Sequence, residues 1–309
     1  MVRPLRSLPE QPDARLADLV ASFRRDLRAD GKASRTCQLY GIAVELFSGW
    51  LAEQGRPQTL GELTRPALRE WFAALAGINA ASTIRTRWKG MHRFCGWLVA
   101  EGELAETPMT GMTAPNPPPT PVPILSDDEL TALLKACSGR TIADRRDEAM
   151  LRMLLDCGIR VSELTGLRVV DVDLDHEYAT VTGKGSKVRP VYFGTRTARA
   201  LDRYLRERRR HRWAHVDALF LSERGPMSPD GVRERMKVRA VEAGLKDRLH
   251  PHRFRHTFAH DFLMAGGGER DLKRLAGWTS DVMLERYGAS AADVRAQAAA
   301  KRLRRGDRV

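Results

Sequence analysis

Five short motifs in the second half of the sequence combine residue types that suit chemistry on a phosphate ester. In chain order, their central residues are Arg160, Lys184, His252 with Arg255, Trp278 and Tyr287. Breaking a phosphodiester requires a nucleophile, cations that neutralise the non-bridging oxygens, and a proton donor for the leaving alkoxide. Metal ions often provide the cationic clamp, but two arginines can do the same. The motifs therefore predict a phosphoryl-transfer site.

Arg160 and Arg255 are the candidate clamps, because a guanidinium is planar, permanently charged and matches two phosphate oxygens at once. Arg160 lies on a predicted turn between two helices. His252 and Arg255 are three residues apart near the start of a predicted helix at 252–264, so their side chains share one face. The N-terminus of that helix, with Pro251 in its first turn, also attracts an anion.

Lys184, Trp278 and Tyr287 can complete the reaction. Lys184 lies between two glycines in a predicted turn, where its ammonium can reach the leaving oxygen. Trp278 offers an indole N–H that can only donate. Tyr287 must lose its proton as it attacks, because the ordinary pKa of a tyrosine is about 10. The alternatives are a solvated turn for Lys184 and a core position for Tyr287.

Three histidines, His252, His256 and His260, share a helical face at i, i+4 and i+8, an arrangement that could hold a metal. The sequence offers neither a partnering glutamate in a zinc-peptidase arrangement nor a fourth ligand nearby. We therefore expect no metal and no cofactor. His256 and His260 are then structural, and His256 is also a candidate for orienting the catalytic groups.

Apolar residues at helical spacing predict the elements that must position these groups. Helices are predicted around 16–23, 40–51 and 82–100, and then at 127–137, 142–157, 195–209, 229–243, 252–264 and 270–276. Two segments, 178–182 and 188–193, alternate like strands and are joined by a turn at 183–186. The predicted fold class is mainly α: an N-terminal helical bundle, then an α-rich domain with a small antiparallel sheet.

A proline-rich run separates the two parts. Six prolines among residues 115–123 form a stiff, extended segment that can be neither helix nor central strand. The predicted divisions are an N-terminal extension (1–12), a helical core DNA-binding domain (13–110), a Pro-rich linker (111–125), a catalytic domain (126–290) and a basic C-terminal helix or tail (291–309).

The charge of the chain favours a polyanionic partner. Its 309 residues include 52 Lys and Arg against 39 Asp and Glu, a formal net charge of +13, which most simply indicates nucleic acid. No apolar run is long enough to cross a bilayer, and the first residues do not form a secretory signal. The four cysteines lack zinc-type spacing and are predicted to be reduced core thiols. We expect a cytoplasmic, nucleoid-associated protein with no membrane partner.

Basic side chains on two elements are candidate DNA contacts. On the predicted helix 82–100 they form a row at i, i+4 spacing, for which a solvated helix face is the alternative. Others follow the turn between the two predicted strands. The candidates are Arg85, Arg87, Lys89, Arg93, Lys187 and Arg189.

The order and spacing of the five motifs closely resemble those of the tyrosine recombinase (phage integrase) family, and of its Xer-type members in particular. The family pattern runs Arg, Glu, Lys, His-x-x-Arg, His or Trp, and then Tyr. The counterparts here are Arg160, Glu163, Lys184, His252 with Arg255, Trp278 and Tyr287. The resemblance covers roughly residues 13–290 and is stronger in the second domain than in the first.

This resemblance implies a site-specific DNA recombinase of Xer, integrase or transposon type. Tyr287 is implied to form a 3′-phosphotyrosyl intermediate, and strands to exchange through a Holliday junction. Arg160 and Arg255 would neutralise the developing charge. Lys184 would protonate the leaving 5′ oxygen, and His252 would handle the tyrosine proton.

The resemblance also implies how the protein is assembled. The first domain would be a SAM-like core-binding bundle that closes over double-stranded DNA, with an inverted-repeat site as the expected target. The protein would be a homotetramer on DNA and a monomer or weak dimer when free. Glu163 would steady the catalytic histidine, and the helix at 291–305 would pack into a neighbouring subunit.

The sequence departs from the family pattern at two places. Trp278 stands where many members carry histidine, and Ala276 with the glycines at 266–268 differs from the usual context. Two other functions remain as alternatives. One is a type IB topoisomerase-like enzyme, which relaxes DNA by the same covalent chemistry. The other is a DNA-binding architectural protein without catalysis.

Overall fold

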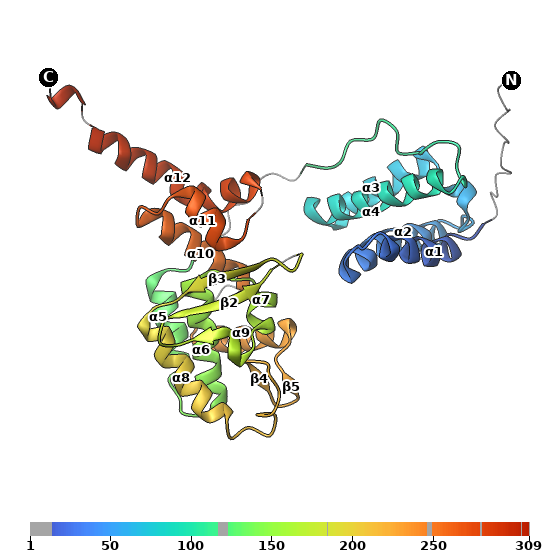
Figure 1. The fold of residues 1–309 in the computed structure, drawn as a ribbon. Coiled ribbons are helices and arrows are strands. Elements are labelled where there is room, and N and C mark those ends of the chain that lie inside the picture. The colour runs from blue at the N-terminus through green and yellow to red at the C-terminus, as the bar shows by residue number, and fades with distance from the viewer. Residues whose placement is uncertain are drawn as a thin grey trace, which may run out of the picture. The chain divides into compact units, whose positions relative to one another are not determined.

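The computed structural model describes residues 14–116, 123–183, 185–245, 249–278, 280–303 and 305–308. The chain divides into two compact units, Met1–Pro118 and Pro119–Val309 (Figure 1), and each is built around its own hydrophobic core. Among the described residues, no helix is both long and apolar enough to span a membrane.

The first unit is a helical bundle. Its elements are α1 (Leu16–Ala29), α2 (Ser34–Glu53), the 3₁₀ helix η1 (Leu60–Glu62), α3 (Arg65–Ile78) and α4 (Ala81–Ala100). Helix α2 packs against both α1 and α4. Edge-on aromatic contacts join the helices in the core, where ring centroids are 5.3 Å apart for Phe23 and Phe94 and 5.4 Å apart for Phe47 and Trp71. Burial of these large rings stabilises the bundle.

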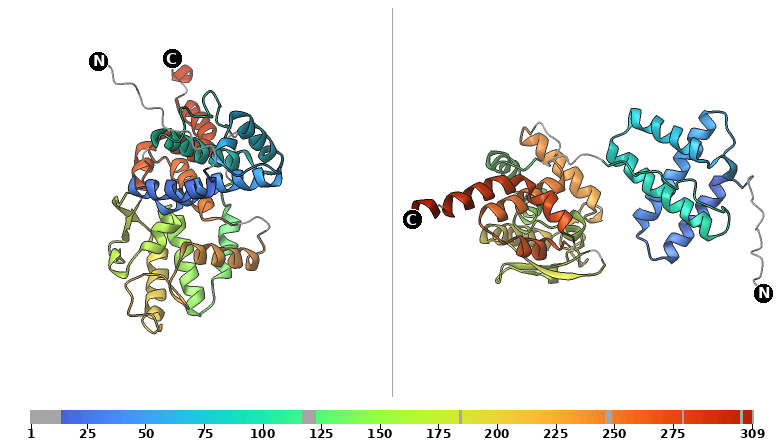
Figure 2. Two further views of the ribbon diagram at one scale, coloured as in Figure 1. Left: turned by 90° about the vertical axis from the view of Figure 1, so that its right-hand side faces the viewer. Right: turned by 90° about the horizontal axis from the view of Figure 1, so that it is seen from above.

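The second unit holds a small antiparallel sheet that lies along one side of its helices (Figure 2). Its strands are β1 (Val172–Asp173), β2 (Tyr178–Thr182) and β3 (Val188–Tyr192), in the order β1-β2-β3. Ala179 pairs with Val191, and Val181 pairs with Arg189. Because side chains alternate between faces along a strand, the three apolar members of these pairs are buried and Arg189 points to the same inner face.

Helices make up most of the rest of this unit. They are α5 (Asp127–Ala136), α6 (Ile142–Cys157), α7 (Val161–Gly166), η2 (Val169–Asp171), α8 (Thr195–Arg208), α9 (Pro229–Glu242), α10 (Pro251–Met264), α11 (Glu269–Ala276), α12 (Asp281–Leu303) and η3 (Arg305–Arg308). A two-stranded hairpin, β4 (Leu221–Ser222) with β5 (Gly225–Pro226), completes it. Helix α6 packs against α8 and α10 and contributes Met150, Met153 and Leu154 to the core.

The predicted fold class is confirmed: the chain is mostly helical with small antiparallel sheets. Local signals set several helix starts, such as the capping boxes Ser126–Glu129 and Thr141–Asp144. All four cysteines are free and buried. Helix α12 continues through residue 290, the predicted boundary between the catalytic domain and a C-terminal helix or tail. The proposed N-terminal extension and the prolines at 117–121 lie outside the described residues.

Candidate active site

Arg160 lies at the start of α7, directly after the turn that ends α6. Gly158 caps α6 in the left-handed region, with φ of 55°, and an added Cβ there would lie 2.2 Å from the ring of Phe258. Arg160 donates its backbone N–H to Glu163 Oε2 (2.8 Å) and Nη1 to Glu163 Oε1 (2.9 Å). About a third (33%) of the Arg160 side chain stays exposed, so the turn presents a guanidinium to solvent.

Glu163 is the buried centre of this arrangement. Only 2% of its side chain is exposed, and Arg189 from β3 donates Nη1 and Nη2 to its two oxygens at 2.9 and 3.0 Å. Burial by itself raises the pKa of Glu163, but the hydrogen bonds from Arg189 and Arg160 outweigh it and hold the pKa below its usual range. One carboxylate therefore serves two guanidinium groups.

Arg189 also reaches helix α11. Its Nε donates to the carbonyl oxygen of Leu275 at 2.8 Å, in the last turn of that helix. Gly277 then ends α11 in the left-handed region, with φ of 64°. A Cβ at Gly277 would lie 3.0 Å from Arg189 Cζ, so the glycine provides both the backbone conformation and the room for the arginine.

Arg255 on α10 joins the same two chain segments. It is 2% exposed and donates Nη1 to the carbonyl of Gly158 (2.7 Å) and Nη2 to that of Ala276 (2.5 Å). Its Cζ lies 5.3 Å from the ring centroid of the buried Trp278, within the range of a cation–π interaction. Hydrogen bonds thus run in a closed loop from the α6–α7 turn through α10, α11 and β3 to α7.

Four residues of the predicted catalytic pattern therefore lie in one connected cluster: Arg160, Glu163, Arg255 and Trp278. On α10, His252 is exposed in the first turn and His256 is buried. Among the described residues, no group of three His, Cys, Asp or Glu side chains is placed to hold a metal ion.

Lys184 lies outside the described residues, but its neighbour Gly183 does not. A Cβ on Gly183 would be 3.1 Å from Glu163 Oε1, so the β2–β3 hairpin passes directly beside the cluster. Tyr287 lies in α12, and its side chain is not among those described. Helix α12 packs against α10, the helix that carries His252 and Arg255.

The predicted DNA contacts have different surroundings. On α4, Arg85 bonds to Asn116 (3.2 Å), Arg93 pairs with Asp30 (2.7 Å), Arg87 is half-buried and Lys89 is exposed. In the second unit, Lys187 is exposed.

Arg189, another of the predicted DNA contacts, instead packs inward with 13% of its side chain exposed. This internal role was missed by the sequence analysis. The signal for it is the strand alternation, because Arg189 is two residues from the buried Val191. An arginine at an inward position needs an acidic partner.

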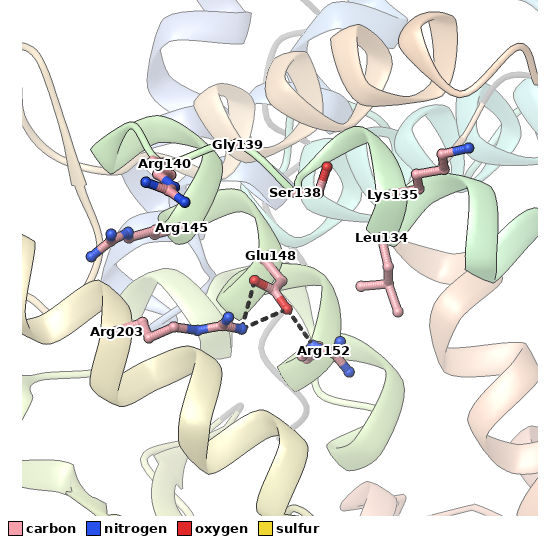
Figure 3. Close-up of a pocket in the computed structure, with 9 residues that line it drawn as sticks. All are labelled: Leu134, Lys135, Ser138, Gly139, Arg140, Arg145, Glu148, Arg152 and Arg203. Atoms are coloured by element: carbon pink, nitrogen blue, oxygen red, sulfur yellow. Dashed lines mark hydrogen bonds and ion pairs between the residues drawn. The ribbon is translucent and has the colours of Figure 1, made fainter.

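An arginine-rich hollow separate from this cluster lies between α5, α6 and α8 (Figure 3). It encloses about 480 Å³ and is lined by Lys135, Arg140, Arg145, Arg152 and Arg203, among others. Glu148 accepts hydrogen bonds from Arg152 (2.9 Å) and Arg203 (3.0 Å) (Figure 3). None of the predicted site residues is among its lining side chains.

Sequence comparison finds one family and a consistent group of relatives. Residues 123–293 match the family model of the Phage integrase family. Tyrosine recombinase XerC of Myxococcus xanthus is 30% identical over 280 residues, which cover 88% of this chain and 93% of the relative. Tyrosine recombinase XerD of Bifidobacterium longum (strain NCC 2705) is 32% identical over 270 residues, covering 83% and 87%.

Solved structures share the fold at lower identity. XerH site-specific recombinase bound to a palindromic difH substrate, in a post-cleavage complex, aligns with a TM-score of 0.75 at 17% identity and covers 97% of this chain and 99% of that one. A lambda integrase tetramer bound to a Holliday junction aligns with a TM-score of 0.69 at 17% identity, covering 90% and 78%.

Proposed function

The chain belongs to the phage integrase family as a Xer-like tyrosine recombinase, a site-specific DNA recombinase, and we propose that it cuts DNA through a covalent bond to Tyr287. In the proposed step, the phenolic oxygen of Tyr287 attacks the scissile phosphorus. A 3′-phosphotyrosyl ester forms, and the bond from phosphorus to the 5′ oxygen breaks. The ester conserves the energy of the phosphodiester, so rejoining requires no ATP.

Four further residues have roles in this proposal. Arg160 and Arg255 neutralise the charge that develops on the non-bridging oxygens. Lys184 gives a proton to the leaving 5′ oxygen, and His252 accepts the proton of the tyrosine. A 5′-hydroxyl from a partner duplex then attacks the ester, which restores the phosphodiester and frees Tyr287.

The observation that carries this proposal is the charge of the cluster around Glu163. The guanidinium groups of Arg160 and Arg189 share the carboxylate of Glu163, which leaves one surplus positive charge. Of these three side chains, Arg160 is the most exposed. Such a site attracts and orients a phosphate. The helix that carries Tyr287 packs against α10, the helix that carries Arg255.

The assembly is proposed on the same basis. Four copies hold two duplexes and exchange strands through a Holliday junction, as the lambda integrase tetramer bound to such a junction suggests by its shared fold. The target is an inverted repeat, the free protein is a monomer or weak dimer, and the second half of α12 docks on a neighbouring copy. We place the protein with the nucleoid in the cytoplasm, because DNA is its substrate.

A nicked suicide substrate tests the proposed chemistry. Its sequence is first enriched by repeated rounds of binding to the protein. Cleavage near the nick then releases a short fragment that carries the 5′-hydroxyl, so that the covalent adduct accumulates. Wild-type protein is expected to form the adduct. Tyr287→Phe is expected to form none while its affinity for the same DNA changes less than about threefold, because one hydroxyl contributes little to a phosphate-dominated interface.

Three outcomes would contradict the proposal. An adduct on Tyr287→Phe would assign the nucleophile elsewhere. No adduct on wild-type protein that still binds the DNA would favour an architectural role. Relaxation of supercoiled plasmids by monomers, independent of sequence, would favour a topoisomerase-like enzyme.

A further inference from the structure

We propose that Arg189 is a positioning residue for Arg160. By binding both carboxylate oxygens of Glu163, Arg189 leaves the guanidinium of Arg160 available for the scissile phosphate. This inference rests on the proposed function, because it assigns Arg189 a task in the same phosphate clamp. It also replaces the DNA contact predicted for Arg189 from the sequence.

The hydrogen bonds of Glu163 provide the first argument. Each carboxylate oxygen accepts two donors: Oε1 from the Nη1 atoms of Arg160 and Arg189, and Oε2 from the Arg160 backbone N–H and Arg189 Nη2. An arginine facing a carboxylate alone favours a two-bond fork. Here Arg189 occupies the fork, and Arg160 holds Glu163 by Nη1 alone. Within the described structure, Nε and Nη2 of Arg160 remain as donors for a ligand.

The charges of the three side chains provide the second argument. With Arg189 the triad carries two positive charges and one negative charge, and without Arg189 it would be neutral. The exposed fractions are 2% for Glu163, 13% for Arg189 and 33% for Arg160. The surplus positive charge is therefore exposed to solvent at Arg160. A neutral triad would attract a phosphate less strongly.

The contact with α11 provides the third argument. Arg189 Nε holds the carbonyl of Leu275 at 2.8 Å, and the next carbonyl, that of Ala276, accepts from Arg255. One side chain thus fixes the distance between the turn that carries Arg160 and the helix end that precedes Trp278. Because the carbonyls of Leu275 and Ala276 are adjacent, the position of Arg160 is linked through Arg189 to that of Arg255.

Single-turnover cleavage of the nicked substrate tests this role. Arg189→Gln is expected to cleave roughly 10- to 100-fold more slowly than wild type, the loss that partners orienting a reactive group typically cause. DNA affinity should change less than about threefold, since many phosphate contacts remain. Cleavage at the wild-type rate would overturn the inference.

A matched control is available eight residues after Arg160. Arg168 makes the same pair of contacts with Asp171, through its backbone N–H (2.8 Å) and its guanidinium (2.7 Å). Its side chain is exposed and it belongs to neither the clamp nor the cluster. Arg168→Gln is expected to cleave at the wild-type rate, and a loss equal to that of Arg189→Gln would show that the effect is general.

A substrate with a neutral methylphosphonate at the scissile position separates positioning from mere folding. If Arg189 supplies net charge for a phosphate oxygen, its removal should matter less when that charge is absent. The ratio of wild-type to Arg189→Gln rates is expected to fall at least threefold on this substrate. An unchanged ratio would reduce Arg189 to a structural residue and overturn the inference.

If Arg189→Gln does not fold, the variant Arg189→Lys tests the same inference. Lysine retains the charge but cannot form the fork on Glu163, so cleavage at least threefold slower with an unchanged melting temperature is expected. Wild-type cleavage by this variant would contradict the inference. Failure of the inference is distinguishable from failure of the proposed function, because only the latter abolishes the adduct on wild-type protein.

Discussion

Two buried carboxylates in the second unit are each surrounded by arginines, yet they do different work. Asp147 on α6 is 1% exposed. It accepts two bonds from Arg146 (3.0 and 2.8 Å), two from Arg235 (2.9 and 2.8 Å) and one from Arg239 (2.9 Å). Glu163 is equally buried but receives two arginines. The two centres use the same residue types and the same bond lengths.

The difference lies in how the remaining donors are used. Arg239 also binds Asp144 (2.8 Å) and Glu242 (2.8 Å), so three acidic groups balance the three arginines around Asp147. Around Glu163 no second carboxylate joins the contacts described for Arg160 and Arg189. A balanced cluster ties helices together, whereas a cluster with surplus charge at its open side can take up an anion.

The largest effect is expected from removing Arg239. Arg239→Ala removes a buried guanidinium that joins the buried Asp147 to the half-buried Asp144, and breaking a buried ion pair typically costs about 3–5 kcal/mol of unfolding free energy. Urea denaturation measures this loss. Arg235→Ala is the control, since that side chain is 30% exposed and its removal should cost less. Equal losses would mean that burial does not distinguish the two arginines.

A smaller but more selective effect is expected at the cationic cluster. Arg160→Lys should slow single-turnover cleavage at least about 100-fold, roughly 2.7 kcal/mol of transition-state stabilisation, because a point charge cannot replace the guanidinium fork. Its unfolding free energy should change by less than about 1 kcal/mol, and its DNA affinity should persist. Full cleavage by this variant would remove Arg160 from the clamp.

The smallest expected effect is on the pH dependence of the unfolding free energy. Because its pKa is depressed in the folded protein, Glu163 adds stability above the pKa of the unfolded chain, about 4.3. That stability is lost as the pH falls through the folded-state pKa. The difference in unfolding free energy between wild type and Glu163→Gln should therefore shrink on acidification below about pH 5. A difference that stays constant from pH 7 to pH 3 would show that Glu163 is not held ionised.

Much of this architecture could be predicted from the sequence because its signals are local. The capping residues Ser126 and Thr141 mark where helices start, and alternating apolar residues mark β2 and β3. The relative order of Arg160, Arg255 and Trp278 indicated that they belong to one site.

The partners of the buried arginines could not be predicted in the same way. Arg189 meets Glu163 across 26 residues and Leu275 across 86, and Arg239 meets Asp147 across 92. Such pairings depend on the strand register and on where α11 ends, which no local pattern specifies. The continuity of α12 across the predicted boundary at residue 290 was also missed, although alanines on both sides of that position favour a helix.

The uninterrupted helix α12 has a mechanical consequence. Position 287 lies sixteen residues before Leu303 at the helix end, and at a rise of about 1.5 Å per residue this part of the helix is roughly 24 Å long. In the proposed assembly, a neighbouring copy that binds the C-terminal part of α12 would displace residue 287 by tilting the helix, without contacting the reacting groups.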